Sequence, residues 1–257
     1  MIKKYIRLFR IAASFLTPFP IGVKDEIKDA ELASSMRLYP LVGLMLGLAY
    51  ILIKAASNWV GLSNIVASTL IVLAMTALSG GIHMDGLSDM CDGFYGGRDK
   101  TDILRIMRDP HAGVMGVLGI IFILLLKWSV VASVMNEPYG WRLILLAPIM
   151  SRWAMVMATA MGPYADPNFP GIARSFVNNI SRTDWQIATI ISVALAAAIF
   201  YAGGVVIAIL APIITIVIVL YARKIIGGVT GDILGAINEI IEALVLFSGY
   251  LLLVARL

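Results

Sequence analysis

The stretch VMGVLGIIFILLLKWSVVASVM, residues 114–135, decides the fold class of this chain. Its only charged residue is Lys127, which lies midway along the run. A helix needs about 20 apolar residues to cross the hydrocarbon core of a bilayer, and this run is long enough to do so. Residues 114–135 therefore predict a membrane-spanning helix.

Apolar runs of similar length recur along the chain and predict an all-α, polytopic membrane protein. The further runs are 38–56, 64–83, 141–162, 186–202, 204–222 and 237–255. Together they predict about seven transmembrane helices in a single membrane-embedded domain, 1–257. The fifth and sixth runs are short and are separated only by Gly203-Gly204. This pair of runs predicts either a tight hairpin or one re-entrant element.

The composition excludes several classes of protein. Hydrophobic residues make up 60% of the chain and charged residues 14%, which is too little charge to coat a soluble domain of this length. The single cysteine, Cys91, excludes a disulfide framework and a multi-cysteine zinc site. The net charge is a modest +4, and no basic stripe with interleaved aromatic residues is present, so nucleic acid is not an expected partner.

The N-terminal residues 2–16 predict an amphipathic helix that lies on the membrane. Lys3, Lys4, Arg7 and Arg10 are spaced among isoleucine, leucine and phenylalanine, a pattern typical of helices that bind in the interface. A signal peptide is the weaker interpretation, because the apolar run is interrupted and no small-residue cleavage site follows. The lipid bilayer is therefore an expected partner of this helix.

The basic residues outside the spans predict the orientation of the chain. With the N-terminus in the cytoplasm, the cytoplasmic segments are 1–37, 84–113, 163–185 and 223–236. The opposite side keeps only Lys54, Arg142 and Arg256. This asymmetry follows the positive-inside rule and predicts a multi-pass protein of the cytoplasmic (inner) membrane. All carboxylates except Glu137 fall on the same side, so we expect the active site to face the cytoplasm.

A first acidic cluster follows the second predicted span, in GGIHMDGLSDMCDG, residues 80–93. Asp85, Asp89 and Asp92 are spaced i, i+4 and i+7, which places them within roughly 60° on one helix face. Aligned like charges repel one another, so a cation is expected among them. Oxygen ligands favour Mg²⁺ or Mn²⁺. The alternative is a solvated acidic face, and His83 is expected to be a hydrogen-bonding neighbour rather than a ligand.

A second acidic cluster lies in GGVTGDILGAINEIIE, residues 227–242. Shifting the first cluster by 147 residues (85 to 232) superposes Gly80-Gly81, Asp85, Leu87 and Asp92 on Gly227-Gly228, Asp232, Leu234 and Glu239. The match reflects either a faint internal repeat or chance. Glu239 and Glu242 lie within an apolar run, where a carboxylate is costly unless it is paired or binds a metal.

Glycines and basic residues near the two clusters predict contacts to an anionic substrate. A diphosphate needs close approach of the backbone, which the glycines of 227–231 permit. Arg98 follows the first cluster. Arg152 lies within the fourth span and is expected to face either a carboxylate, such as Glu239 or Glu242, or a substrate phosphate. Lys127 is expected to snorkel or pair, and it receives no functional role.

At these residues the chain resembles the adenosylcobinamide-GDP ribazoletransferases, a family also called cobalamin synthases. The markers of this resemblance are FLTPFP (15–20), YPLVG (39–43), HMDGLSDMCDG (83–93), IMRD (106–109), SR (151–152) and GGVTGDILGA (227–236) with Glu239 and Glu242. They occur in order across almost the whole chain, which argues against coincidence.

The resemblance implies a transferase that completes the nucleotide loop of coenzyme B12. Its small-molecule substrates would be adenosylcobinamide-GDP and α-ribazole or its 5′-phosphate, the product adenosylcobalamin or its phosphate, the released group GMP and the cofactor Mg²⁺. The metal ligands expected on this basis are Asp85, Asp89, Asp92, Asp232 and Glu239. The expected catalytic residues are Asp92 or Glu242 as base and Arg152. The expected phosphate-binding residues are Arg98, Asp109, Gly228, Thr230 and Gly231.

Two other functions share some of these features. CDP-alcohol phosphatidyltransferases and membrane prenyltransferases also pair aspartate clusters at a membrane face, but the spacing of Asp85, Asp89 and Asp92 differs from theirs. A cation transporter would use Glu239 and Glu242 in a pore, yet transport predicts carboxylates at the bilayer midplane or on both faces. The sequence leaves open whether the chain forms a homo-oligomer.

Overall fold

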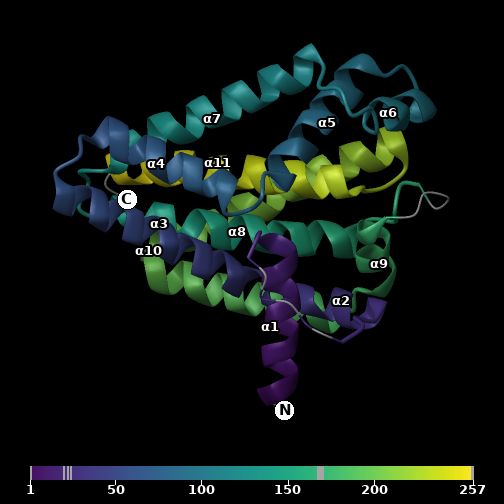
Figure 1. The fold of residues 1–257 in the computed structure, drawn as a ribbon, viewed down its shortest axis with the longest axis horizontal. Coiled ribbons are helices and arrows are strands. Elements are labelled where there is room, and N and C mark those ends of the chain that lie inside the picture. Colours follow the sequence, from purple (N-terminus) through teal and green to yellow (C-terminus); the bar gives the residue numbers. More distant parts are fainter. Residues whose placement is uncertain (1, 20, 22, 24, 167–170, 256–257) are drawn as a thin grey trace.

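The protein is a bundle of long helices, with short helices gathered at one end of it (Figure 1). The computed structural model describes residues 2–19, 21, 23, 25–166 and 171–255. Pro20 and Arg256, which the sequence patterns included, lie outside these residues. The only β-pairing in the described ranges is an isolated bridge between Tyr164 and Val229. The predicted all-α, polytopic class is therefore confirmed.

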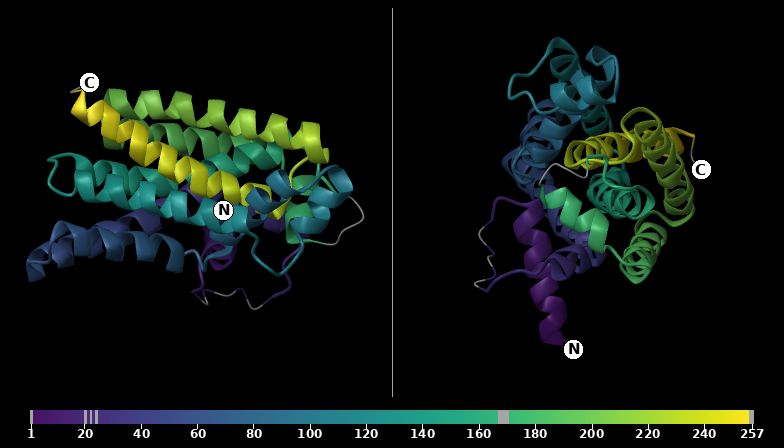
Figure 2. Two further views of the ribbon diagram at one scale, coloured as in Figure 1. Left: turned by 90° about the horizontal axis from the view of Figure 1, so that it is seen from above. Right: turned by 90° about the vertical axis from the view of Figure 1, so that its right-hand side faces the viewer.

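The helices follow one another along the chain with short connections. They are α1 (Ile2–Leu16), α2 (Asp29–Ser35), η1 (Met36–Leu38), α3 (Tyr39–Val60), α4 (Asn64–Ala77), α5 (Ile82–Gly96), α6 (Lys100–Ile106), α7 (Val114–Val134), α8 (Gly140–Met161), α9 (Ile172–Asn179), α10 (Arg182–Ile226) and α11 (Gly231–Val254). The end-on view in Figure 2 shows the long helices packed together and α1 leaving the bundle to one side.

Five helical segments of the described chain are long and apolar enough to cross a membrane. They contain α3, α7, α8, α10 and α11, and a sixth span results if α4 and α5 are counted together. These two helices are bent by 82° at Gly80 and Gly81, whose φ angles of +66° and +73° are left-handed and suit glycine. The predicted count of seven spans is not confirmed.

Helix α10 reverses direction in its middle. Tyr201 has a φ of 49°, and it is the one non-glycine residue with positive φ in the described chain. A Cβ atom added to Gly204 would lie 1.9 Å from the carbonyl oxygen of Ala196. Eight residues of straight helix would separate these positions by about 12 Å. The arms on either side of Phe200 therefore form the tight hairpin that the sequence allowed as one of two alternatives.

Helix α8 occupies the centre of the bundle. It is the most enclosed of the candidate spans, with 94% of its apolar window buried. Helix α3 packs closely against it because Gly43 and Gly47 have no side chains. A Cβ atom at Gly43 would lie 2.3 Å from the carbonyl oxygen of Pro148, and one at Gly47 would lie 2.6 Å from that of Leu145. Small residues permit such close contact between membrane helices.

The segments predicted to lie on one side of the membrane meet at one end of the bundle. Arg37 Nε lies 2.7 Å from Asp184 Oδ1, and Arg108 forms an ion pair with Asp166. We call this end the site end; besides Arg37 and Asp184 it comprises residues 97–113, 162–166, 171–181 and 227–231. At the opposite end, the Arg142 guanidinium lies 4.8 Å from the centre of the Tyr201 ring, where the α10 hairpin turns.

Candidate active site

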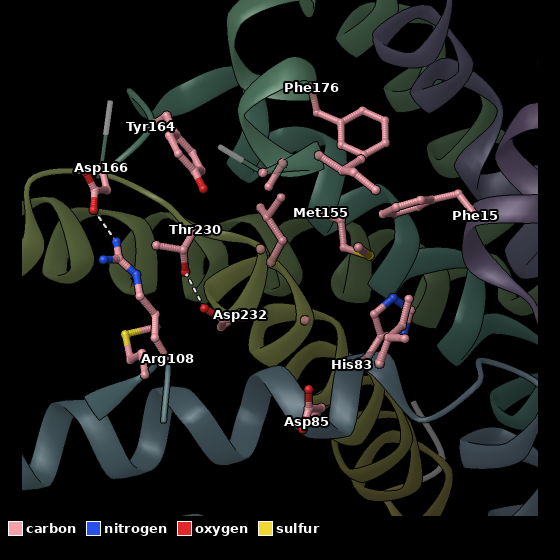
Figure 3. Close-up of a pocket in the computed structure, with 18 of the residues that line it drawn as sticks. Phe15, His83, Asp85, Arg108, Met155, Tyr164, Asp166, Phe176, Thr230 and Asp232 are labelled. Carbon is pink, nitrogen blue, oxygen red and sulfur yellow. Dashed lines mark hydrogen bonds and ion pairs between the residues drawn. The ribbon is translucent and has the colours of Figure 1, made fainter. Parts of the chain in front are cut away.

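A cavity of about 410 Å³ opens at the site end, between α5, α9 and α11. One half of its lining is polar and consists of Asp85, Arg108, Tyr164, Asp166, Thr230 and Asp232. The other half is largely apolar and includes Phe15, Met36, Tyr39, Met155 and Phe176, and His83 lies on this side of the cavity, near Phe15 (Figure 3). Figure 3 shows Arg108, Tyr164 and Asp166 at one end and Phe15 and Phe176 at the other. A site of this kind suits a ligand with both charged and apolar parts.

Two glycines hold α5 and α11 in backbone contact beside the cavity. A Cβ atom at Gly86 of α5 would lie 2.8 Å from the carbonyl oxygen of Asp232. A Cβ atom at Gly235 of α11 would lie 3.1 Å from the Cα of His83. The crossing is thus reciprocal, since each helix uses a glycine against the backbone of the other. It brings Asp85 and Asp232 into the lining of the same cavity.

A short backbone bridge places Tyr164 and Asp166 beside the start of α11. The Val229 N–H donates to the Pro163 carbonyl at 2.9 Å, and the Ala165 N–H donates to the Val229 carbonyl at 3.0 Å. A Cβ atom at Gly228 would lie 2.2 Å from that Pro163 oxygen. Gly228, expected to contact phosphate, is absent from the cavity lining and instead makes room for this bridge.

The N-terminus of α11 lies at the cavity, where Thr230 and Gly231 were expected to contact phosphate. Thr230 caps the helix by accepting a hydrogen bond from the Ile233 N–H at 3.3 Å. Its hydroxyl also lies 3.2 Å from Asp232 Oδ2, to which it donates. Both Thr230 and Gly231 line the cavity. The partial positive charge of a helix N-terminus favours an anionic ligand at this position.

Tyr164 contributes a neutral hydrogen-bond donor to the polar half. Burial, followed by the nearby Asp232 carboxylate, raises the pKa of the Tyr164 phenol. The phenol therefore stays protonated at neutral pH, and its O–H can donate to a ligand oxygen. Nothing in the sequence around Tyr164 indicated this role, because the loop carries no motif and is held at the cavity by the bridge to Val229 and by the Arg108–Asp166 ion pair.

The three aspartates of the first cluster have different surroundings. Asp85 lines the cavity, and Asp89 is half-buried one turn further along α5. Asp92 accepts hydrogen bonds from the Gly113 N–H at 2.7 Å and the Gly116 N–H at 2.8 Å. It therefore caps the N-terminus of α7, an arrangement in which a carboxylate is favourable. Asp92 was expected to be a metal ligand or a base, but both of its carboxylate oxygens accept these hydrogen bonds.

The two glutamates of the second cluster belong to a buried ion-pair network. Lys127 Nζ lies 2.5 Å from Glu239 Oε2 and 2.6 Å from Glu242 Oε2. Arg152 Nη1 lies 2.9 Å from Glu242 Oε1. Each of the four side chains is at most 3% exposed. We call them the buried quartet; two positive and two negative charges balance within it, as low-dielectric surroundings require.

The buried quartet bears on three expectations from the sequence. Glu239 was expected to bind metal, Glu242 to act as a base and Arg152 to contact a phosphate. None of them lines the cavity, and all three are engaged with one another or with Lys127. The structural ion pair considered for Arg152 is the arrangement that the structure contains. Lys127, to which no role was given, is the partner that the two glutamates share.

Two further expected phosphate contacts lie outside the cavity. Arg98 is exposed, and its backbone N–H donates to Asp102 Oδ2 at 3.2 Å. Asp109 is exposed and accepts a hydrogen bond from the His111 N–H at 2.9 Å, which lowers the pKa of the Asp109 carboxyl. Arg108, the residue before it, lines the cavity instead. The segment identified in the sequence therefore reaches the cavity through Arg108 rather than through Asp109.

The residues at the cavity fit an open magnesium site. In the part of the chain that the structure describes, no group of three or more His, Cys, Asp or Glu side chains is placed to enclose a metal ion. Asp85 and Asp232 nevertheless line one cavity. Magnesium is commonly bound through one or two carboxylates together with water and substrate phosphates. The donor set therefore fits Mg²⁺ in the presence of a phosphorylated substrate.

These features define a polytopic α-helical membrane protein with an acidic, phosphate-compatible cavity at one end of its bundle. The family model described as Cobalamin-5-phosphate synthase matches residues 8–250. The chain therefore belongs to the cobalamin-5-phosphate synthase family, and it is a transferase. No solved structure matches it.

Several curated relatives are called adenosylcobinamide-GDP ribazoletransferase. The protein of Desulforamulus reducens is 37% identical over 240 residues, which cover 93% of this chain and 94% of the relative. That of Syntrophobacter fumaroxidans is 36% identical and covers 93% and 96% of the two chains. That of Clostridium tetani is 32% identical and covers 93% and 94%.

The buried quartet predicts a large loss of stability when its charge balance is broken. In Lys127→Met, Arg152 still pairs with Glu242, but the buried Glu239 carboxylate loses the cation it pairs with. We expect the free energy of unfolding to fall by about 3–5 kcal/mol. The double variant Lys127→Met/Glu239→Gln restores the balance and should recover most of the loss. Thermal unfolding in detergent measures both variants. Equal stability of the single variant and the wild type would contradict this role for Lys127.

The bridge at Gly228 predicts a second effect on stability. Gly228→Ala forces the 163–165 backbone away from α11, and we expect it to destabilise the protein by about 1–3 kcal/mol, as overpacking does. Gly96→Ala is the matched control, because the nearest atom to its added Cβ would lie 3.4 Å away, at Ile106. Thermal unfolding of both variants checks the prediction, which fails if the two behave alike.

Proposed function

We propose that this protein joins α-ribazole, or its 5′-phosphate, to the adenosylcobinamide-phosphate part of adenosylcobinamide-GDP, with release of GMP. The name that the relatives share describes a transfer from adenosylcobinamide-GDP to ribazole. The observation that carries the proposal is the cavity that Asp85, Asp232, Arg108 and the phosphate-compatible N-terminus of α11 line together. A phosphorylated donor and an alcohol acceptor need a site of this chemistry.

The reaction replaces a phosphoanhydride bond with a phosphodiester bond. The ribazole hydroxyl oxygen forms a bond to the cobinamide-side phosphorus, and the bond from this phosphorus to the oxygen of GMP breaks. Arg108 and the N–H groups at the start of α11 are placed to hold the diphosphate and the departing GMP phosphate. Tyr164 donates its phenolic hydrogen in the same half of the cavity. These residues replace Arg98 and Arg152 in the phosphate-binding role expected from the sequence.

The hydroxyl proton must leave the acceptor as the new bond forms. Asp92 and Glu242 were expected to take it, but their oxygens accept hydrogen bonds from the α7 N-terminus and from the buried quartet. We therefore place the proton acceptor among the carboxylates that line the cavity. General-base catalysis requires hydrogen-bond reach of the reacting hydroxyl, which only a residue at the cavity provides.

Magnesium would be held by Asp85 and Asp232, with Asp89 as a further candidate ligand on the same face of α5. When bound, Mg²⁺ offsets the negative charge that develops on the phosphate oxygens. The two aspartates come from helices whose backbones are in contact, so their separation depends on Gly86 and Gly235. This arrangement supports the expectation of a magnesium-dependent transferase.

We further propose that the site end faces the cytoplasm and that the protein lies in the inner membrane. The predicted cytoplasmic segments meet at this end through Arg37–Asp184 and Arg108–Asp166. They carry most of the basic residues of the chain, as the positive-inside rule requires. Cytoplasmic GDP-linked substrates could then enter the cavity without crossing the bilayer.

Turnover by the purified protein tests the proposed function. With adenosylcobinamide-GDP, α-ribazole and Mg²⁺, we expect GMP and the corrinoid product to form in equal amounts, and chelation of the metal should abolish both. Chromatography follows the two products. Folded, metal-supplied protein that releases neither product would contradict the proposal.

Replacement of Asp85 tests the carboxylate pair. Asp85→Asn keeps the size of the side chain and removes its charge, and we expect turnover to fall by at least about a hundredfold while thermal stability is retained. Glu26→Gln, an exposed change outside the cavity, is the control and should keep wild-type turnover. Activity of Asp85→Asn close to that of the wild type would remove Asp85 from the proposed metal site.

A further inference from the structure

We infer that the apolar half of the cavity binds the flat, largely apolar heteroaromatic base of the acceptor nucleoside, with His83 as its hydrogen-bond partner. We call this half the base pocket and define it by Phe15, Tyr39, His83, Met155 and Phe176. The inference rests on the proposed function and assigns the two halves of the cavity to two parts of the substrates. Phosphate groups occupy the polar half, and the base occupies the other.

Three aromatic rings from different parts of the chain meet in the base pocket. The rings of Phe15 and Phe176 lie edge to face with centroids 4.9 Å apart. The ring of Tyr39 is nearly parallel to that of Phe15, at 6.5 Å. These residues come from α1, α3 and α9, so the pocket exists only when all three helices are assembled. Aromatic side chains around a slot favour a flat aromatic ligand.

Two hydrogen-bonding groups in the base pocket have no partner in the described part of the protein. Both ring nitrogens of His83 and the hydroxyl of Tyr39 are buried and form no hydrogen bond there. His83 is 2% exposed and Tyr39 is fully buried. Buried polar atoms are rarely left unpaired, because doing so costs stability. Both residues line the cavity, so an occupant with a polar atom on its edge can supply a missing partner.

The residues of the base pocket favour one of three possible occupants: a lipid chain, guanine or a less polar bicyclic base. A lipid chain would fill the apolar volume but offer no hydrogen-bond partner to His83. Guanine carries several donors and acceptors along its edge, and the carboxylates that could accept from it, Asp85 and Asp232, lie toward the polar half (Figure 3). A bicyclic base with apolar edges and one acceptor nitrogen matches the pocket, since a neutral imidazole can donate to that nitrogen. Ribazole, a benzimidazole nucleoside, has a base of this kind.

Binding of each substrate separately tests the base pocket without requiring turnover. The full-length protein in nanodiscs is titrated with α-ribazole and, in a second experiment, with adenosylcobinamide-GDP, both by calorimetry. We expect Phe15→Leu to weaken α-ribazole binding roughly tenfold, the scale of a lost base–aromatic contact, and to change the affinity for adenosylcobinamide-GDP less than twofold. Phe94→Leu is the matched control, because Phe94 forms an edge-to-face pair with Tyr221 at 5.6 Å and lies outside the cavity.

A second variant separates the hydrogen bond from packing. His83→Phe keeps a flat ring and removes both nitrogens, and we expect α-ribazole to bind roughly tenfold more weakly. The riboside of indole, which lacks the acceptor nitrogen, should bind the wild type and His83→Phe equally. Equal losses for α-ribazole and the indole riboside would show that His83 acts only through packing and would overturn its assigned role.

The outcomes distinguish this inference from the proposed function. Selective loss of α-ribazole affinity in both variants supports the base pocket, even if the wild type shows no turnover. Selective loss of adenosylcobinamide-GDP affinity would place guanine in the pocket and overturn the inference, as would unchanged binding of both substrates. If the wild type turns over its substrates but Phe15→Leu and His83→Phe bind α-ribazole as tightly as the wild type does, the proposed function stands and the base pocket is rejected.

Discussion

The contact between α5 and α11 is the constraint on which the site depends. Gly86 and Gly235 let two backbones touch, and the cavity lies beside this contact, lined by residues of α5, α9 and α11. Each helix begins after a glycine with positive φ, Gly81 for α5 and Gly227 shortly before α11. The faint repeat seen in the sequence therefore has a structural counterpart: two glycine-hinged helices that present Asp85 and Asp232 to one space.

Most of the long helices could be predicted from the length of the apolar runs. The features that could not be predicted depend on the backbone conformation of single residues. The runs 114–135 and 141–162 correspond to α7 and α8 almost residue for residue, because lipid imposes both length and composition. The α10 hairpin could only be left as one of two alternatives, since it depends on a single positive φ at Tyr201. The second predicted span ends early, because Gly80 and Gly81 bend the chain before α5 begins.

The sequence indicated those residues of the candidate site whose side chain and motif reach the cavity together. Asp85, Asp232, Thr230 and Gly231 do so. Glu239 and Glu242 were rightly identified as costly in an apolar run, but the sequence could not show that Lys127, on another helix, neutralises them. Arg108, Tyr164 and Asp166 reach the cavity through loop packing between distant segments, and a single sequence carries no signal of that packing.

The buried quartet also has a consequence for how the protein is made. Lys127 precedes Glu239 by 112 residues, and Arg152 precedes Glu242 by 90. During synthesis both cations therefore enter the membrane long before their counter-charges exist. The charges of Lys127 in α7 and Arg152 in α8 are costly in the bilayer until α11, the last helix of the described chain, inserts and pairs with them. Insertion of α11 is thus the step that neutralises the buried cations of the nascent chain. A chain truncated before α11 would keep two unpaired positive charges within the bilayer, and the full-length chain would not.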